Sequence, residues 1–176
     1  LYRALCDDER RAGVTARIVV LHDAEDMVDP AALSLFDQAM DNADFAQLPV
    51  LAMPQMRSRW IAGHYSDEFA EAHGKVMVVR GAIGAGLPSA GVGTAIARPM
   101  LARLAGLQPE IGPFPTGSLT EDYELGLRIA AMGGKGRFLR YRTQDGRLVA
   151  TRAFFPAGLD QAVRQKTRWI NGIALH

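Results

Sequence analysis

The chain has 176 residues, of which 48% are apolar and 22% are charged, and its formal net charge is +1. This length can bury the core of one ordinary domain, and the balanced charge argues against a broad nucleic-acid-binding surface. The single cysteine, Cys6, excludes an internal disulfide, and we find neither a signal-peptide pattern nor an apolar run of membrane-spanning length.

The first part of the sequence alternates between helix and strand patterns. The expected elements are a helix, a strand, a helix and a strand, at residues 1–12, 17–21, 29–40 and 47–53. The run at 17–21 is continuously apolar and β-branched, which is typical of a buried parallel strand. Asp29 and Pro30 fit an N-cap and a first helical residue. Pro49 weakens the second strand because proline cannot donate to a ladder.

The middle of the sequence is helical and then rich in glycine. Residues 58–73 predict a helix in which Trp60, Tyr65 and Phe69 are packing positions. Residues 81–99 are too apolar for a linker, so we expect an ordered loop close to a ligand or another backbone. The remaining patterns are a strand or continued helix, a short strand and a helix, at residues 75–80, 92–97 and 99–105.

A threonine and two carboxylates, Thr120, Glu121 and Asp122, open the next predicted helix. Its apolar stripe is formed by Leu125, Ile129 and Met132, and Gly133 and Gly134 are placed to end the helix. Thr120 fits an N-cap, which puts both acids in the first turn, at the mouth of a long Pro/Gly-rich loop. The simple interpretation is that they complement the helix dipole.

The C-terminal part predicts a hairpin and a last helix. Residues 136–142 and 148–154 alternate around an Asp145-Gly146 turn. The last helix begins near Leu159 and runs to the end of the chain. Its natural core face is the stripe Leu159, Val163, Ile170 and Ala174.

Alternating strands and helices predict an α/β domain with a mostly parallel sheet, in which ligands bind beyond the carboxyl ends of strands. His22-Asp23-Ala24-Glu25-Asp26 stands at such an end. Carboxylate oxygens are ligands that divalent cations prefer. Asp23 and Glu25 would share a face if the strand geometry continues, whereas Asp26 would point elsewhere. A solvated acidic turn is the alternative.

The last helix carries a second polar stripe. Gln165, Arg168 and Trp169 fall at positions i, i+3 and i+4, so they lie on one narrow stripe. Gln165 and Arg168 are off the core stripe, and Trp169 sits between the two stripes. An arginine fork suits a diphosphate, and an indole offers a flat platform for a sugar ring. The alternative is a surface helix whose tryptophan covers an edge of the core.

Taken together and in this order, the patterns DAED, TED and QxxRW resemble the family 2 processive glycosyltransferases, the cellulose-synthase-like group with a GT-A catalytic domain. The stretches EFAEAHGKVMVVRGAIGAGLPSAGVGTAIAR, TEDYELGLRI and QKTRWINGI look closest to the glycosyltransferase domain of the inner-membrane phage-adsorption protein B group. The resemblance covers nearly the whole chain and implies a single partial GT-A domain over residues 1–176.

The resemblance implies roles for the acidic residues. Asp23 and Glu25 would hold Mg²⁺ or Mn²⁺ with the diphosphate of a nucleotide-diphospho-sugar, and Asp26 is a possible substitute ligand. Asp122 would be the general base that deprotonates the acceptor hydroxyl, with Glu121 as its neighbour in the motif.

The resemblance also implies substrate-binding residues. Thr120 belongs to the TED motif, and the QxxRW residues would grip the diphosphate and the acceptor end of the glycan. A small-residue acceptor loop falls at Gly91 to Thr94, which makes Gly91, Gly93 and Thr94 candidates. The implied reaction is an inverting hexosyl transfer to a glycan in polysaccharide biosynthesis, on the cytoplasmic side of the inner membrane.

One departure from the family concerns the nucleotide. The family carries a strand, a loop and a base-binding Asp upstream of DAED, whereas only a short helix and one strand precede Asp23 here. We therefore expect the N-terminal nucleotide-binding part and the membrane helices to lie outside this chain, and the chain alone to be inactive. The alternative functions are a glycosyltransferase-derived binding or receptor-scaffold module, and a nucleotidyltransferase, which gives no reason for QxxRW.

Overall fold

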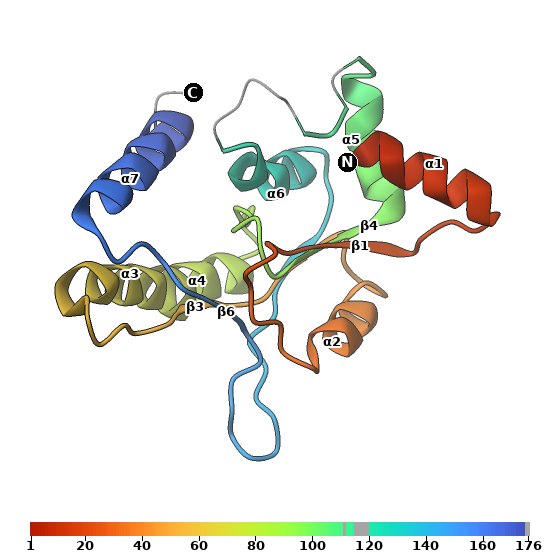
Figure 1. Cartoon of the computed structure of the whole chain (residues 1–176). Coiled ribbons are helices and arrows are strands. Elements are labelled where there is room, and N and C mark those ends of the chain that lie inside the picture. Colours follow the sequence, from red (N-terminus) through yellow and green to blue (C-terminus); the bar gives the residue numbers. More distant parts are fainter. Residues whose placement is uncertain (111, 115–119, 175–176) are drawn as a thin grey trace.

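The structure is a computed structural model that describes residues 1–110, 112–114 and 120–174, with the side chain of residue 174 outside the description. Figure 1 shows its helices, which are α1 (Tyr2–Ala12), α2 (Ala32–Ala39), α3 (Arg59–Glu71), the π-helical turn η1 (Ala72–Val76), α4 (Met77–Ala82), α5 (Arg98–Leu107), α6 (Glu121–Ala131) and α7 (Leu159–Ala174). The strands are β1 (Ile18–Leu21), β2 (Phe45–Gln47), β3 (Val50–Ala52), β4 (Thr94–Ala97), β5 (Gly136–Phe138) and β6 (Thr151–Ala153).

The described strands form two sheets, with the orders β1-β4-β2-β5 and β3-β6. In the larger sheet β4 is antiparallel to both β1 and β2, while β5 is parallel to β2. Strands β1, β2 and β5 therefore share one direction, and β4 is reversed between two of them. The smaller sheet pairs β3 and β6 in parallel. The predicted α/β class with mostly parallel strand directions is confirmed.

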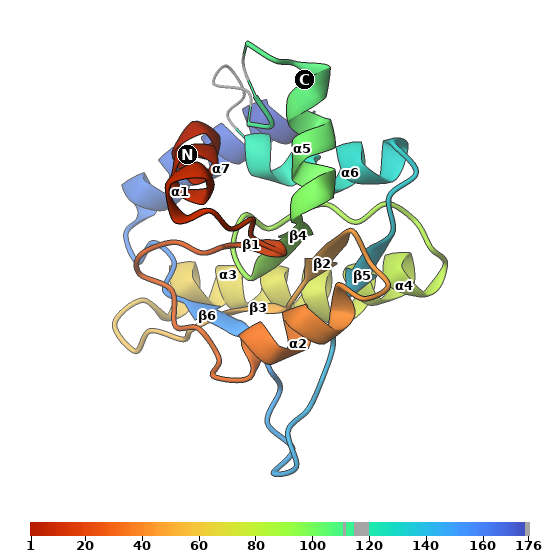
Figure 2. The same cartoon turned by 90° about the vertical axis from the view of Figure 1, so that its right-hand side faces the viewer.

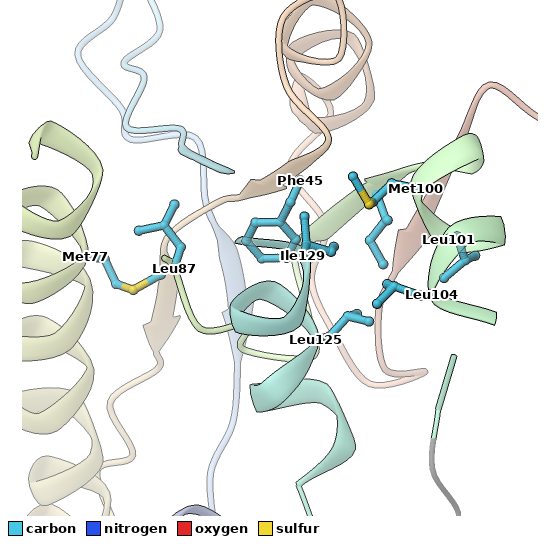
Figure 3. Packing of buried hydrophobic residues seen from close by; sticks show 9 residues of the cluster. Phe45, Met77, Leu87, Met100, Leu101, Leu104, Leu125 and Ile129 are labelled. Carbon is cyan, nitrogen blue, oxygen red and sulfur yellow. The ribbon is translucent and has the colours of Figure 1, made fainter. Parts of the chain in front are cut away.

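Helices cover both faces of the larger sheet, with α1, α5 and α6 on one side and α2 on the other (Figure 2). Strand alternation explains the two cores. Phe45 pairs with Ile96 and points to the α5 and α6 side, whereas Ala46 pairs with Ala95 and points to α2. Figure 3 shows the first core, built from Phe45, Met77, Leu87, Ile96, Met100, Leu101, Leu104, Leu125 and Ile129. This core holds α6 in place through its apolar stripe.

Strand β1 corrects one prediction. It was expected as a buried parallel strand, but among the described residues it pairs only with the antiparallel β4, and its residues are half-buried. Its continuous apolar run has a different cause. Val19 and Leu21 pack against the first core, and Ile18 and Val20 pack against the second, so both faces of an edge strand are covered.

The range expected as one strand, residues 47–53, contains the last residue of β2 and the whole of β3. β2 ends at Gln47 and β3 begins at Val50, and the chain passes from the larger to the smaller sheet between them. The break lies at Leu48-Pro49 because Pro49 has no N–H to donate to a ladder. Its carbonyl still accepts from the N–H of Thr151 at 2.9 Å, which starts the pairing with β6.

The predicted hairpin is correct at its turn and wrong for its strands. Gly146 N–H donates to Thr143 O at 2.9 Å, and Arg142 bridges Leu148, so the Asp-Gly turn forms. β5 and β6 do not pair with each other, because each adds in parallel to a different strand of the diverging pair β2 and β3.

The helix expected at residues 58–73 runs further, through the π-helical turn η1 into α4, which makes 75–80 helical. The turn brings His73 to the sheet, where its Nδ1 accepts the Val50 N–H at 2.6 Å. Tyr65 is buried as predicted and Phe69 is half-buried, but Trp60 is 92% exposed in the first helical turn, so its packing role was wrong.

The predicted core stripe of α7 is also wrong. Leu159, Val163 and Ile170 are 66%, 53% and 59% exposed. The helix instead buries Ala162 and Gly172 and half-buries Trp169. Periodicity correctly grouped the apolar residues on one face, but it could not say which face meets the rest of the domain.

Candidate active site

One cleft, with a volume of about 940 Å³, joins the three motifs. It lies on the side of the larger sheet where Figure 1 shows α6 between α7 and α1. The sequence-predicted residues that line it are Asp23, Gly91, Thr120, Glu121, Asp122, Arg168 and Trp169. Four separate segments therefore converge: the end of β1, the glycine loop before β4, the start of α6 and the last helix.

The acidic turn after β1 presents Asp23 to the cleft and turns Asp26 inward. Asp26 has a side chain that is 2% exposed, and its Oδ2 accepts the backbone N–H of Asp23 at 2.9 Å. The same oxygen lies 3.3 Å from Nδ1 of His22, which also lines the cleft. Asp26 therefore shapes the turn instead of offering a free ligand, in contrast to its expected role as a substitute ligand.

Asp23 stands in a negative environment. Burial raises the pKa of its carboxyl, and the neighbouring Asp26 and Glu25 raise it further, while Arg168 and His22 lower it. Glu25 is exposed and does not line the cleft. Among the described residues, no group of three or more His, Cys, Asp or Glu side chains is placed to hold a metal ion.

Asp122 lies in the first turn of α6, where buried Leu125 and Ile129 anchor the helix to the core. Its Oδ1 accepts the N–H of Tyr123 at 2.8 Å. Burial raises the pKa of Asp122 above its usual value; Glu121 adds to the rise, and the Tyr123 N–H and Arg168 oppose it. A carboxylate with a raised pKa is a stronger base, which is what abstraction of a hydroxyl proton requires.

The glycine loop closes on that carboxylate. Gly91 has φ of +76°, and a Cβ built on it would lie 2.2 Å from Asp122 Oδ2. Only glycine suits both the backbone conformation and the lack of space. Gly91 thus approaches a side chain, whereas the expected approach of residues 81–99 to another backbone is present at Leu87, whose carbonyl oxygen would lie 2.1 Å from a Cβ on Gly126.

The other two candidates of this loop lie elsewhere. Gly93 and Thr94 are buried and do not line the cleft. Thr94 begins β4, and its hydroxyl donates to the Gln47 side chain at 2.7 Å. Their direct contact with an acceptor, expected from the resemblance, has no support in this geometry.

Arg168 connects the two acidic motifs. Its guanidinium is exposed in the cleft, and its charge lowers the pKa of both Asp23 and Asp122. The close approach of α7 to the start of α6 makes this possible, because a Cβ at Gly172 would lie 2.5 Å from Thr120 Oγ1. A cation within reach of both carboxylates is placed to meet an anionic ligand between them.

Trp169 lines the cleft and closes an aromatic cluster. Its ring meets those of Tyr65, Phe69 and Phe155 edge-on, with centroids 6.2, 6.4 and 6.4 Å away. This packing fixes one face of the indole on the domain. Gln165, in contrast, does not line the cleft, and its Oε1 is buried on the packed side of α7.

Sequence reasoning missed the residue that sets this helix in place. Lys166 Nζ lies 4.6 Å from the Tyr65 ring centroid and 4.7 Å from that of Trp169, and it pairs with Glu68 of α3. Its position three residues before Trp169, on the same side of a helix, was the available signal. The cleft also reaches Tyr2, Arg3 and Phe114, for which the sequence offered no pattern.

Comparison with known proteins adds the family. A family model described as "Glycosyl transferase family group 2" matches residues 18–176. The chain belongs to this family. The resemblance stated from DAED, TED and QxxRW is thereby confirmed, and with it the GT-A fold.

Two curated relatives are similar over almost the whole chain. They are bacteriophage adsorption protein B of Escherichia coli strain K12 and bacteriophage N4 adsorption protein B of Escherichia coli O157:H7, each 35% identical over 186 residues. The match covers 97% of this chain and 25% of either relative, so the chain spans about a quarter of their length.

Membership of the family makes the domain glycosyltransferase-like and implies, in general, a nucleotide-sugar donor and an acceptor. Within the described residues, no helix is both long and apolar enough to span a bilayer.

Proposed function

We propose that this chain is the catalytic segment of an inverting glycosyltransferase that moves a hexosyl group from a nucleotide-diphospho-sugar to a hydroxyl of a glycan acceptor. The observation that carries the proposal is the position of Arg168, whose charge acts on Asp23 and on Asp122 across one cleft. A diphosphate bound near Arg168 and Asp23 would leave Asp122 free to face the sugar.

The residues then divide the chemistry between them. Asp122 takes the proton of the acceptor hydroxyl as its oxygen attacks the anomeric carbon from the face opposite the diphosphate. The bond from that carbon to the diphosphate oxygen breaks, and the electron pair leaves with the nucleoside diphosphate. Arg168 stabilises the charge that develops on the leaving group. A single displacement inverts the anomeric carbon.

The donor set at Asp23 fits a divalent cation that is shared with the substrate. Burial and the neighbouring Asp26 and Glu25 raise the pKa of Asp23, and a bound cation would relieve this repulsion. Mg²⁺ is commonly held by one or two carboxylates plus substrate phosphates. We propose that Asp23, with Glu25 beside it, holds Mg²⁺ or Mn²⁺, which would supply Lewis-acid stabilisation of the diphosphate.

We also propose that the full-length protein works at the cytoplasmic face of the inner membrane, in polysaccharide biosynthesis. Two features support contact with a bilayer. Leu159, Val163 and Ile170 form an exposed apolar stripe on α7, and Trp60 is exposed directly after Arg57-Ser58-Arg59. Apolar stripes and tryptophans next to basic residues suit the membrane interface.

The decisive experiment uses the full-length protein in detergent or vesicles with a panel of nucleotide-diphospho-sugars and glycan acceptors. We expect release of a nucleoside diphosphate that depends on the acceptor, and loss of release in Asp122→Asn with nucleoside-diphosphate affinity retained. Glycan binding without turnover under all conditions would contradict catalysis and would favour the non-catalytic binding module.

A further inference from the structure

Three buried polar side chains form a chain of hydrogen bonds beneath the glycine loop. Thr94 Oγ1 donates to Gln47 Oε1 at 2.7 Å and lies 3.1 Å from Ser89 Oγ. Ser89 Oγ accepts the backbone N–H of Gly91 at 3.0 Å. This series of hydrogen bonds therefore runs from Gln47, on β2 in the middle of the larger sheet, to the backbone of Gly91, which faces Asp122.

Gln47 has further contacts with the same loop. Its Nε2 lies 2.8 Å from Leu48 O, 2.9 Å from Val92 O and 3.1 Å from Gly93 O, and its Oε1 accepts the N–H of Ala90 at 2.9 Å. The side chain is fully buried. A buried amide that lacked these partners would be costly, so the loop and the glutamine fix each other's positions.

The loop is also pressed against α6 at three places. Ser89 N–H donates to Tyr123 O at 3.2 Å, and a Cβ at Gly126 would lie 2.1 Å from Leu87 O. The third place is the contact of Gly91 with Asp122. Any displacement of the loop therefore changes the space in front of the carboxylate.

We propose that Gln47, Thr94 and Ser89 are positioning residues, which hold Gly91 against Asp122 and so set the direction from which the acceptor hydroxyl reaches the base. The inference rests on the proposed function, since it assigns the glycine loop to the acceptor side of that reaction. Gln47 and Ser89 carried no role in the sequence patterns, and Thr94 acts here through the loop instead of touching the glycan.

The donor side meets this network through the backbone, where Thr94 pairs with Leu21 of β1, and not through side chains. Asp23 and Arg168 belong to β1's end and to α7, and no hydrogen bond among the described residues joins either side chain to Gln47, Thr94 or Ser89. Disturbing the network should therefore alter acceptor use and turnover while nucleoside-diphosphate affinity is retained. A purely structural network would lower stability without this selective effect.

The experiment compares Ser89→Ala and Thr94→Val with wild type in the full-length protein. Ser89→Ala removes one hydroxyl and the direct link to Gly91, and Thr94→Val keeps the shape of the side chain. The matched control is Ser58→Ala, because Ser58 is also buried and donates to a backbone carbonyl, but this carbonyl is Ala157 O at 2.7 Å, outside the glycine loop.

We expect Ser89→Ala and Thr94→Val to lower kcat/KM for the acceptor roughly ten- to hundred-fold, since a misplacement of about 1 Å can cost that much. Nucleoside-diphosphate affinity should stay within about twofold of wild type, and Ser58→Ala should match wild type in both measurements, with a lower melting temperature at most. If Thr94→Val does not fold, Ser89→Ala decides.

An active wild type together with a folded Ser89→Ala of unchanged acceptor kcat/KM would overturn the inference alone. So would an equal loss of donor and acceptor affinity, which indicates general loosening. A wild type that transfers no sugar to any acceptor would overturn the proposed function, and the inference with it.

Discussion

Gly91 lies so close to Asp122 that a Cβ on the glycine would be 2.2 Å from the carboxylate Oδ2. The glycine loop and the start of α6 are therefore complementary surfaces, and the proposed base lies at their junction. This relationship connects the conformation of the loop to the position of the Asp122 carboxylate.

Gly91→Ala should lower turnover and stability together. Its φ of +76° is strained for alanine, and the new methyl group would displace the Asp122 carboxylate. Left-handed conformations cost non-glycine residues about 1–3 kcal/mol. We expect at least a roughly tenfold loss of kcat, since misplaced catalytic groups cost that much or more.

The control is Gly84→Ala, because Gly84 has φ of +69° and a Cβ added there would meet nothing within 4 Å. It carries the backbone strain without the clash, so it should melt earlier but keep its kcat. Equal kcat in both variants would show that the contact with Asp122 is unimportant for turnover.

Asp122→Asn should stabilise the protein at neutral pH. Burial raises the pKa of Asp122 in the folded state, so the unfolded chain ionises at lower pH, and keeping the charge costs folded stability. This cost appears as the pH rises from the ordinary aspartate pKa through the raised one. The variant should thus melt above wild type at pH 7 to 8, while its kcat falls roughly 10²- to 10⁴-fold.

Melting at low pH tests whether the ionised Asp122 carboxylate is the cause of this stability difference. At a pH below the ordinary aspartate value of about 3.9 the wild-type carboxyl is neutral in both states, so the stability difference should shrink. A variant that melts below wild type at pH 8 would mean that the carboxylate forms favourable contacts that outweigh its burial.

The pattern in the sequence predicted the convergence of the motifs better than it predicted individual side chains. An apolar run placed Asp23 at a strand end, an N-cap pattern placed Asp122 in a first helical turn, and helical spacing placed Arg168 on a polar stripe; all three line the cleft. Whether a neighbouring residue points in or out depends on local hydrogen bonds. Asp26 turned inward to accept an N–H, and Thr94 turned into the sheet.

Packing direction was the other limit. The apolar positions of α7 were grouped on one face correctly, but the helix docks through Trp169 and Lys166 onto the α3 aromatics, leaving Ile170 exposed. Likewise, the reversal of β4 within the sheet follows from its two partners and not from its own residues. Periodicity describes one element, whereas both outcomes depend on pairs of elements.

Divalent metal should bind this chain weakly without nucleotide. Among the carboxylates of the acidic turn only Asp23 lines the cleft, and Asp26 is already hydrogen-bonded, so a Mg²⁺ or Mn²⁺ ion would keep most of its water. Titration calorimetry with Mn²⁺ should show binding that strengthens when a nucleoside diphosphate is present. Tight binding of Mn²⁺ to the chain alone would contradict a shared site.

The exposed stripe on α7 should bind anionic vesicles. Val163→Ser and Ile170→Ser replace apolar side chains that are 53% and 59% exposed, so the fold should be unaffected. Full burial of such a side chain contributes about 1.5–3 kcal/mol, so each change should weaken vesicle binding roughly tenfold. The control is Val79→Ser, which changes a similarly exposed valine on α4. If all three substitutions weakened vesicle binding equally, the α7 stripe would not be a specific membrane-binding surface.

Arg168 should be required for the diphosphate in a way that lysine cannot fully replace. Its guanidinium is exposed in the cleft, acts on both Asp23 and Asp122, and follows directly before Trp169, whose ring is fixed by packing. A planar fork can meet two phosphate oxygens at once, whereas an ammonium is a compact point charge. A charge-assisted contact contributes about 1.5–3 kcal/mol, so Arg168→Ala should weaken nucleoside-diphosphate binding roughly ten- to hundred-fold. The nucleoside-diphosphate affinity of Arg168→Lys should lie between those of wild type and Arg168→Ala.

The control for Arg168 is Arg164→Ala, since Arg164 is exposed on the same helix but does not line the cleft. All three variants should melt near wild type because both arginines are exposed, and Arg164→Ala should bind nucleoside diphosphate normally. Titration calorimetry and thermal melting of the full-length variants measure the two quantities separately. Early melting of Arg168→Ala with normal diphosphate affinity in the folded protein would make the residue structural, and it would remove the cation that the proposed reaction needs between its two carboxylates.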